Sequence, residues 1–195
     1  MNCLGGFYSG KLDAYPCIAF ALLDDEGEVM SACECGIDSL LTKIAMKEIA
    51  DKPGFLSEPA IDSSNNLAIY AHCVSATKLY GFDKEAEPFI IRDHAEDNKG
   101  ASLQVLNSHF GVGTVTKIFP LEKKVLLLKG EIQGRMESEL ACRTKIVVKV
   151  KDAQRLIEEW LYGWHRVLYY RDWSKEIRWL SKLLGYELVV EEGSL

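Results

Sequence analysis

The sequence has 195 residues, of which 48% are hydrophobic and 27% are charged, as in an ordinary globular protein. The formal net charge is -6 and no run of Lys and Arg stands out, so we expect no nucleic-acid partner. No apolar stretch approaches the roughly 18 residues of a membrane span, and the opening residues lack an apolar signal core. We therefore expect no membrane partner, a cytoplasmic location and six reduced cysteines.

Residues 1–85 are predicted to form an α/β-like segment. An apolar run over 18–23, a turn over 24–27 and a second run over 29–33 predict a hairpin-like pair of strands. Apolar residues at helical spacing over 37–49 predict a helix that ends before Pro53-Gly54. Runs over 55–60 and 67–73, separated by a polar turn, predict two further strands.

Residues 86–151 change character, because short β-prone runs replace amphipathic helices. Gly, Asn and charged pairs separate these runs, which predicts a central antiparallel β-barrel of Greek-key type. Residues 152–195 predict a helix capped by Asp152, a strand, a second helix capped by Asp172 and a last strand. We expect this helix-strand-helix-strand segment to pack back on the core, which gives a mixed α+β fold.

Three polar side chains stand at or inside predicted strands of the first segment. Glu34 follows a strand-like run, Glu58 lies inside one, and His72 ends one. Each residue alone is more often a solvated acid or a structural histidine than a ligand. Because ligands gather at strand ends in α/β units, their shared placement favours a divalent metal site. His165, far along the chain beside Trp164, is either a packed histidine or a further ligand.

A second metal hypothesis uses thiolates. Cys33, Cys35, His72 and Cys73 could form a structural zinc site, since thiolates and imidazoles suit zinc. The spacing lacks the usual Cys-x-x-Cys pairs, which makes this the weaker hypothesis. His94 and His109 lie in polar surroundings and are predicted to be loop residues that line a cleft.

Several segments together resemble a known family. The chain is similar to the C-terminal half of the L-fucose isomerase and L-arabinose isomerase group of ketol isomerases. The segments that carry this resemblance are Tyr15-Pro16-Cys17 with Ala32-Cys33-Glu34, Phe55-Leu-Ser-Glu58, Ala71-His72-Cys73, Gly111-Val-Gly-Thr-Val-Thr116, and Trp164-His165 with Tyr169, Tyr170 and Asp172. They keep the order of the family and cover most of the chain.

The resemblance implies roles for the four candidate residues. Glu34 and Glu58 would be the acid/base pair and metal ligands, His165 would be a ligand, and His72 would be a ligand as in the arabinose type. The implied cofactor is a divalent metal, manganese first, with zinc, iron or cobalt as alternatives. The implied partners are a monosaccharide substrate and further copies of the chain, in a trimer or hexamer.

The chain also departs from the family. Family members are more than twice as long, with α/β domains ahead of this part, and fucose isomerases carry Asn-Asp where Cys35-Gly36 stands here. The expected function is therefore the C-terminal portion of a metal-dependent aldose–ketose isomerase that acts through an enediol. The alternative is a non-catalytic sugar- or metal-binding fragment, or a subunit that needs a separate N-terminal domain.

Overall fold

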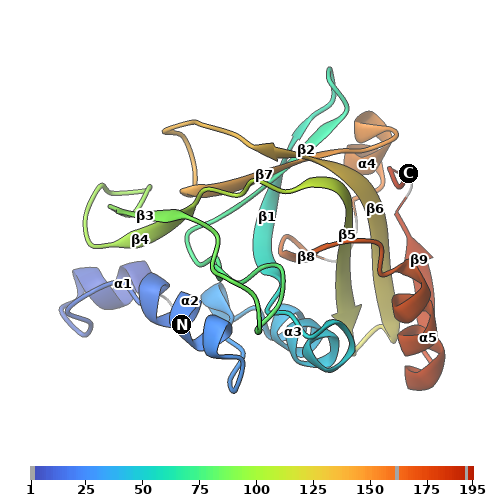
Figure 1. The fold of residues 1–195 in the computed structure, drawn as a ribbon, viewed down its shortest axis with the longest axis horizontal. Coiled ribbons are helices and arrows are strands. Elements are labelled where there is room, and N and C mark those ends of the chain that lie inside the picture. The colour runs from blue at the N-terminus through green and yellow to red at the C-terminus, as the bar shows by residue number, and fades with distance from the viewer. Residues whose placement is uncertain (1–2, 161–162, 192) are drawn as a thin grey trace.

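The structure is a computed structural model that describes residues 3–160, 163–191 and 193–195. Six antiparallel strands close into a barrel in the order β5-β8-β1-β2-β7-β6, and pairing of β5 with β6 completes the ring (Figure 1). The barrel strands are β1 (Phe55–Asp62), β2 (Leu67–His72), β5 (Phe110–Phe119), β6 (Lys124–Arg135), β7 (Thr144–Lys149) and β8 (Arg166–Tyr170). The predicted antiparallel barrel is confirmed, and it takes strands from all three predicted segments. Its Greek-key type and the α/β-like character of residues 1–85 stay predictions.

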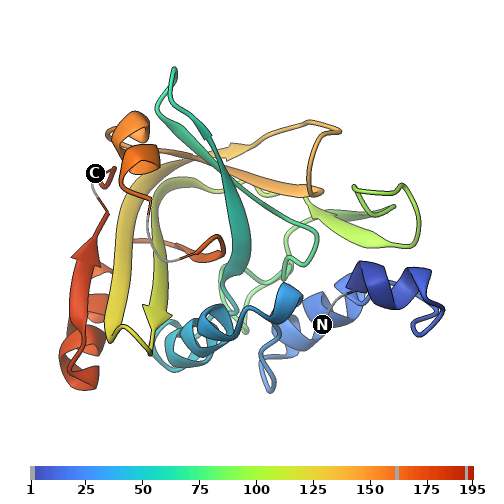
Figure 2. The same ribbon diagram turned by 180° about the vertical axis from the view of Figure 1, so that it is seen from behind.

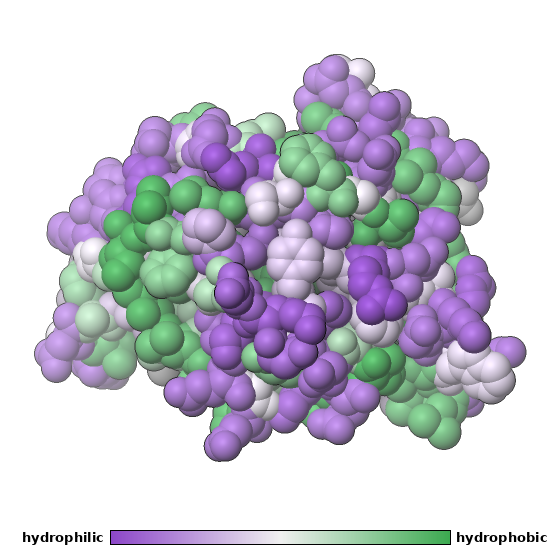
Figure 3. Space-filling model, in the orientation of Figure 1, coloured by the Kyte–Doolittle hydropathy of each residue, from purple (hydrophilic) through white to green (hydrophobic). Residues whose placement is uncertain are grey.

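Three further strands lie outside the closed ring. β9 (Glu187–Val190) pairs in parallel with the first part of β6, whereas β3 (Phe89–Arg92) and β4 (Ser102–Val105) form a separate two-stranded sheet. Figure 3 shows hydrophobic surface toward the side of the molecule where β3 and β4 lie, and the exposed Phe89, Ile90 and Ile91 belong to β3. In the described part of the chain, no helix combines the length and the apolar character that crossing a membrane requires.

The helices surround the barrel. The longest, α3, lies across one end of it and packs against β5 and β8, while α4 lies near the other end and α5 lies beside β9 (Figures 1 and 2). The helices are α1 (Cys3–Tyr8), α2 (Cys17–Glu26), the short 3-10 helix η1 (Cys33–Cys35), α3 (Ile37–Ala50), α4 (Ala153–Glu158) and α5 (Ser174–Leu184).

The predicted hairpin over 18–33 is wrong, because its first strand is the helix α2. Cys17, Ala21 and Asp24 are its buried residues, at spacings of four and three, which places them on one helical face. Gly27 ends the helix in a left-handed conformation and donates its N–H to the carbonyl of Leu23. A short apolar run fits a buried helix as well as a strand, so periodicity alone could not separate the two.

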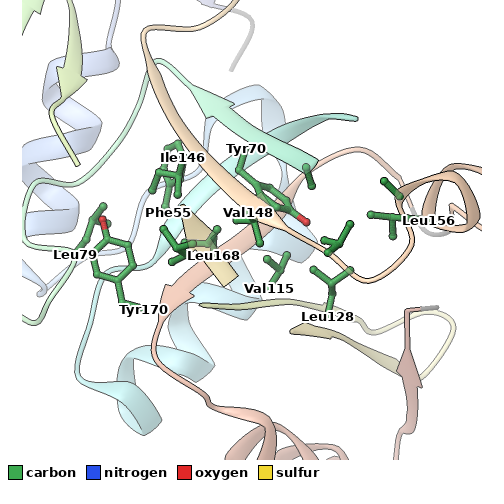
Figure 4. Close-up of a cluster of buried hydrophobic side chains, with 14 of the residues drawn as sticks. Phe55, Tyr70, Leu79, Val115, Leu128, Ile146, Val148, Leu156, Leu168 and Tyr170 are labelled. Atoms are coloured by element: carbon green, nitrogen blue, oxygen red, sulfur yellow. The ribbon is translucent and has the colours of Figure 1, made fainter. Parts of the chain in front are cut away.

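The barrel interior is a continuous apolar core. Along β1 the side chains alternate, so that Phe55 packs inside the barrel while Leu56 packs outside. Figure 4 shows Phe55, Tyr70 and Leu168 converging inside from three neighbouring strands. The outer cluster joins the barrel to α3 and α5 through buried residues that include Met46 and Ile177. Outward-facing residues of β1 thus lie where helices and loops cover the barrel wall.

Candidate metal centre

The centre of β1 is where this strand changes partner. Phe55–Ser57 pair with β8, with Ser57 opposite Arg166. The residues from Glu58 onward pair with β2 instead, with Glu58 opposite Ala71. The residue just before β8 and the residue that ends β2 therefore both reach the level of Glu58. These residues are His165 and His72, so the sheet register itself gathers three of the four candidates.

The structure brings Glu34, Glu58 and His165 together as one group. Each offers a ligand atom, and these three atoms all lie within 4.8 Å of one another. The Nε2 atom of His165 lies 3.2 Å from Oε1 of Glu58 and 3.7 Å from Oε2 of Glu34. The three residues come from a turn, a strand and a loop that are distant in sequence. We call this group the carboxylate–histidine triad.

Glu34 reaches the triad through an unusual backbone conformation. Glu34 and Cys35 both have positive φ, 55° and 57°, in the left-handed region that non-glycine residues rarely adopt. Gly36 follows, and a Cβ atom there would lie 3.8 Å from Nδ1 of His165. This turn therefore lies directly against the His165 ring, and Glu34 reaches the other two residues of the triad from it. Such strained backbone is concentrated at functional sites, so the conformation of this turn favours a functional role for Glu34.

The two carboxylates have different environments. Burial, followed by the negative charge of Glu58, raises the pKa of Glu34. The contact with the His165 ring is the main cause that lowers the pKa of Glu58. As pH rises, Glu58 therefore loses its proton before Glu34 does. Two carboxyl groups whose pKa values are pushed apart can divide the roles of proton donor and proton acceptor.

His72 lies beside the triad rather than inside it. Its ring stacks on that of His165 with centroids 5.6 Å apart, and it forms a second group of ligand atoms with Cys33 and Glu34. Its Nδ1 accepts the backbone N–H of Cys73 at 2.8 Å, which leaves the ring proton of neutral His72 on Nε2. Nε2 of His72 is buried without a hydrogen-bond partner in the described structure, and it could bind a metal only if its proton moved to Nδ1, which would break the hydrogen bond to Cys73.

The triad fits a divalent metal on two observations. Nε2 of His165 is buried. It lies 3.2 Å from Oε1 of Glu58 but does not meet the geometry of a hydrogen bond with any partner in the described structure. Two carboxylates and one imidazole converge in a partly buried space, where a cation would offset the repulsion between the acids. Oxygen and imidazole donors suit manganese, and also zinc, iron and cobalt. Glu34, Glu58 and His165 would hold the ion.

The four residues of the thiolate hypothesis do not meet as one group in the described part of the chain. Cys33 and His72 lie near Glu34, whereas Cys35 is exposed. Cys73 is buried and packs in the same cluster as Cys142. The cysteines of this region belong to a small apolar cluster, whose members include Cys3, Tyr15, Cys17, Cys33, Cys73, Val74 and Cys142.

His94 and His109 both lie in loops, as predicted, but they pack against other side chains. His94, expected to line a cleft, is buried and contacts the sulfur of Cys73. His109 stacks on Tyr170, with ring centroids 4.2 Å apart, and its Nδ1 lies 3.2 Å from the hydroxyl of Tyr80. The sequence could not predict these contacts, because both of them depend on loops that fold back onto the barrel.

An apolar pocket of about 500 Å³ is lined by residues that are next to triad residues in the sequence. Trp164 precedes His165 and Pro59 follows Glu58, and both line the pocket together with Trp160. The two indole rings meet edge to face, with centroids 6.2 Å apart. The pocket is therefore lined by sequence neighbours of Glu58 and His165, and not by the triad residues themselves.

The fold and the site define a class: a small antiparallel β-barrel with two carboxylates and a histidine gathered on its wall. No protein-family model matches the sequence, and a search of curated proteins found no match.

Proposed function

We propose that this chain is the C-terminal portion of a metal-dependent aldose–ketose isomerase. The observation that carries the proposal is the carboxylate–histidine triad, because its three ligand atoms lie within 4.8 Å of one another. The resemblance of the segments around Glu34, Glu58 and His165 to the fucose and arabinose isomerases supports the same roles. A cytoplasmic homo-oligomer, trimeric or hexameric, belongs to the same proposal.

The proposed reaction moves a proton between C1 and C2 of a sugar through an enediol. A bound divalent ion would stabilise the negative charge that develops on the sugar oxygens. Glu34 and Glu58 would accept and donate the proton, since both carboxyl groups reach the same small volume. The contact with His165 favours the ionised form of Glu58, and burial favours the protonated form of Glu34. In the metal-free chain Glu58 is therefore the better candidate for the proton acceptor, and Glu34 is the better candidate for the proton donor.

The proposed substrate is a monosaccharide. Its hydroxyl groups suit the polar triad, while the C–H face of a sugar ring suits an aromatic surface such as that formed by Trp160 and Trp164. The pocket volume of about 500 Å³ is large enough for a ligand of this size.

The alternative is a non-catalytic protein that binds metal or sugar, or a subunit that is completed by a separate N-terminal domain. The exposure of Glu34 favours this alternative, because an isomerase must exclude water from its enediol. Family members carry further domains ahead of the part that this chain resembles, and such a domain could cover Glu34.

Metal binding is tested by titrating Mn²⁺ into metal-free protein in a calorimeter. We expect about one ion per chain, and we expect Glu58→Gln and His165→Gln each to weaken binding at least about 10-fold, because each removes a ligand. Glu122→Gln, at an exposed glutamate of the barrel, is the matched control and should bind like the wild type. If Glu58→Gln and His165→Gln bind Mn²⁺ as tightly as the control, the proposed site is wrong.

Catalysis is tested separately, by incubating the Mn²⁺-loaded protein with a panel of aldoses and following ketose formation. Turnover that disappears in Glu58→Gln supports the isomerase. Stoichiometric metal without turnover on any sugar contradicts the stand-alone enzyme and supports the binding protein. Unfolding by Cys35→Ser and Cys73→Ser, with no effect of Glu34→Gln, would support the structural zinc site instead.

A further inference from the structure

A second cavity, of about 620 Å³, lies beside the end of β8. Three of the residues that line it are cations from different parts of the chain. Lys52 follows α3, Lys84 lies in the loop between β2 and β3, and Arg171 is the first residue after β8. His165 stands just before β8, so the carboxylate–histidine triad lies at the opposite end of this strand. The cavity is therefore separate from the candidate metal centre.

Lys52 is a buried cation without an acidic partner. Only 7% of the residue is exposed, and its Nζ donates to the carbonyl oxygen of Tyr80. Within the part of the chain that the structure describes, Lys52 forms no ion pair with a carboxylate. Lysine is almost never buried unless it is paired, and an ammonium group has three donors to satisfy. The cavity that Lys52 lines is where an anion could pair with it.

The backbone and a ring position Arg171, without an acid. Its φ is 82°, in the left-handed region, where its N–H donates to the carbonyl of Val112 and its carbonyl accepts from the hydroxyl of Thr114. Its guanidinium lies over the ring of Trp173, 4.9 Å from the centroid. Among the described residues, no carboxylate pairs with this guanidinium. Its donors therefore stay available on the wall of the cavity.

The three cations repel one another. Burial, followed by the charges of Arg171 and Lys84, lowers the pKa of Lys52. Lys84 is exposed, and its charge is offset by Asp83, whose Oδ2 lies 2.6 Å from its Nζ. Lys52 and Arg171 are left as two neighbouring positive charges beside one cavity, and an anion between them would remove the repulsion.

Two acids also line the cavity, but neither pairs with these cations. Glu87 is buried, and its two oxygens accept hydrogen bonds from the hydroxyl of Tyr170 and from the backbone N–H of Ser108. Glu85 is exposed, so water and salt screen its charge. The carboxylate of Glu85 is therefore the group in the lining that opposes an anion, and its removal should improve binding.

We propose that Lys52 and Arg171 form a binding site for the phosphate group of a small phosphate monoester. Such a group carries roughly two negative charges at neutral pH, which match the two cations, whereas a carboxylate carries one. Guanidinium donors can bind two phosphate oxygens at once, and the ammonium of Lys52 can bind a third. A cavity of about 620 Å³ is in the range of small-molecule sites, so it also has room for the organic part beside Tyr80.

Calorimetric titration of the full metal-free chain at neutral pH and low salt tests the proposal. Glycerol 3-phosphate, inorganic phosphate and acetate are the three probes. We expect glycerol 3-phosphate to bind most tightly and acetate least tightly. Lys52→Met and Arg171→Gln should each weaken the binding of glycerol 3-phosphate at least about 10-fold, because each removes a charged donor. Glu85→Gln should tighten it roughly 2- to 5-fold.

Two control variants separate this site from other charges. Lys11→Met removes an exposed lysine that does not line the cavity and should bind glycerol 3-phosphate like the wild type. Glu58→Gln should also bind it like the wild type, because Glu58 belongs to the triad at the other end of β8.

Three outcomes would overturn the proposal. One is the absence of any heat of binding from glycerol 3-phosphate up to about 10 mM. Another is equal weakening in Lys52→Met, Arg171→Gln and Lys11→Met, which would show a general attraction to positive charge. The third is acetate that binds as tightly as glycerol 3-phosphate. The first and third are read from the wild type, so they hold even if a variant fails to fold.

Discussion

Lys43 and Asp24 form an ion pair in the interior, between α3 and α2. Both side chains are almost fully buried, and Lys43 also donates to the carbonyl of Ser31 while Asp24 accepts the Ser31 N–H. Burial lowers the pKa of Lys43 and raises that of Asp24, and the attraction between them opposes both shifts. The pair fixes α2 against the helix that follows the Glu34 turn.

Removing one partner of this pair should be costly. Lys43→Met leaves the Asp24 carboxylate buried without its cation, so we expect a loss of roughly 3–5 kcal/mol in the free energy of unfolding. The measurement is urea denaturation at neutral pH. Lys84→Met is the matched control, because Lys84 pairs with Asp83 on the exposed surface and should cost less than about 1 kcal/mol. Equal losses for the two variants would show that burial does not set the cost.

His72 should make the stability of the metal-free protein depend on pH. Burial lowers the pKa of His72 from its ordinary 6.5 to about 4. Between these two values the unfolded chain binds a proton that the folded chain does not, so stability falls as pH decreases from 6.5 to 4. The loss should total about 3 kcal/mol and stop below pH 4.

Urea denaturation across this pH range checks the prediction, with a chelator present. His72→Gln should flatten the loss of stability between pH 6.5 and 4. His94→Gln is an opposite-sign control, because the pKa of His94 is raised by its contact with Cys73, and its stabilisation is present at low pH. Because His94 is protonated in both the folded and the unfolded chain below pH 6.5, this variant should lower stability evenly between pH 6.5 and 4 and leave the slope there unchanged. An unchanged pH profile in His72→Gln would contradict the assignment.

For individual side chains, the sequence predicted the candidate residues but not the residues that they contact. Glu34, Glu58 and His165 could be proposed because their local segments resemble a family. The stacking of His72 on His165 and the pairing of Lys43 with Asp24 could not be predicted. Both depend on distances between elements, and a single sequence carries no signal for such distances. The presence of a lysine in an amphipathic helix predicts a side chain that is exposed to solvent.

Among the elements, the turn at η1 links backbone conformation to the triad. Glu34 and Cys35 are both left-handed, which costs an L-residue roughly 1–2 kcal/mol relative to the right-handed region. The strain persists because α3 begins immediately afterwards and the turn packs against the barrel. Glycine would adopt the same conformation without the Cβ clash, whereas a β-branched residue would resist it.

We therefore expect opposite effects from two substitutions at Cys35. Cys35→Val should lower stability by about 1–2 kcal/mol and weaken Mn²⁺ binding, because the turn no longer aims Glu34 at the triad. Cys35→Gly should fold at least as stably as the wild type and keep its metal affinity. Thermal denaturation and Mn²⁺ titration of both variants make the comparison. Loss of metal binding in Cys35→Gly would mean that the Cys35 side chain, rather than the backbone, supports the site.

Elements with capping residues were the most predictable. Asp152 caps α4 by accepting the Arg155 N–H, as predicted. The predicted cap Asp172 accepts the N–H of Ser174, but the residue at the cap position of α5 is Trp173. The helix α2 was missed, because Pro16 stands where a side-chain cap would announce a helix. Helix caps can be predicted because they depend on local sequence. A short apolar run can form a helix or a strand, and tertiary packing determines which of the two forms.

For the molecule as a whole, closure of the barrel depends on close approach between β6 and β7. A Cβ atom on Gly130 would lie 2.4 Å from a Val148 methyl carbon and 2.8 Å from the carbonyl oxygen of Lys149. On Gly113 of β5, a Cβ atom would meet the flexible end of Ile132 at 2.8 Å, with the nearest backbone atom 3.7 Å away. Backbone cannot move aside as a side chain can.

We expect Gly130→Ala to destabilise the barrel by about 2–3 kcal/mol and Gly113→Ala by about 1 kcal/mol. Chemical denaturation of the two variants gives the comparison, and circular dichroism checks that the sheet is retained. An equal or reversed order would mean that β7 can shift away from β6 without opening the ring.

The change of partner along β1 also determines when the site can exist during folding. Glu58 and His165 become neighbours only when β8 pairs with β1, after roughly a hundred intervening residues have been organised. Contacts so distant along the chain form slowly, because the entropy of closing the loop is lost before the contact stabilises anything. The triad is therefore absent from any compact state in which β8 has not docked. A metal ion held by the triad would therefore stabilise the closed ring relative to partly folded chains in which β8 has not docked.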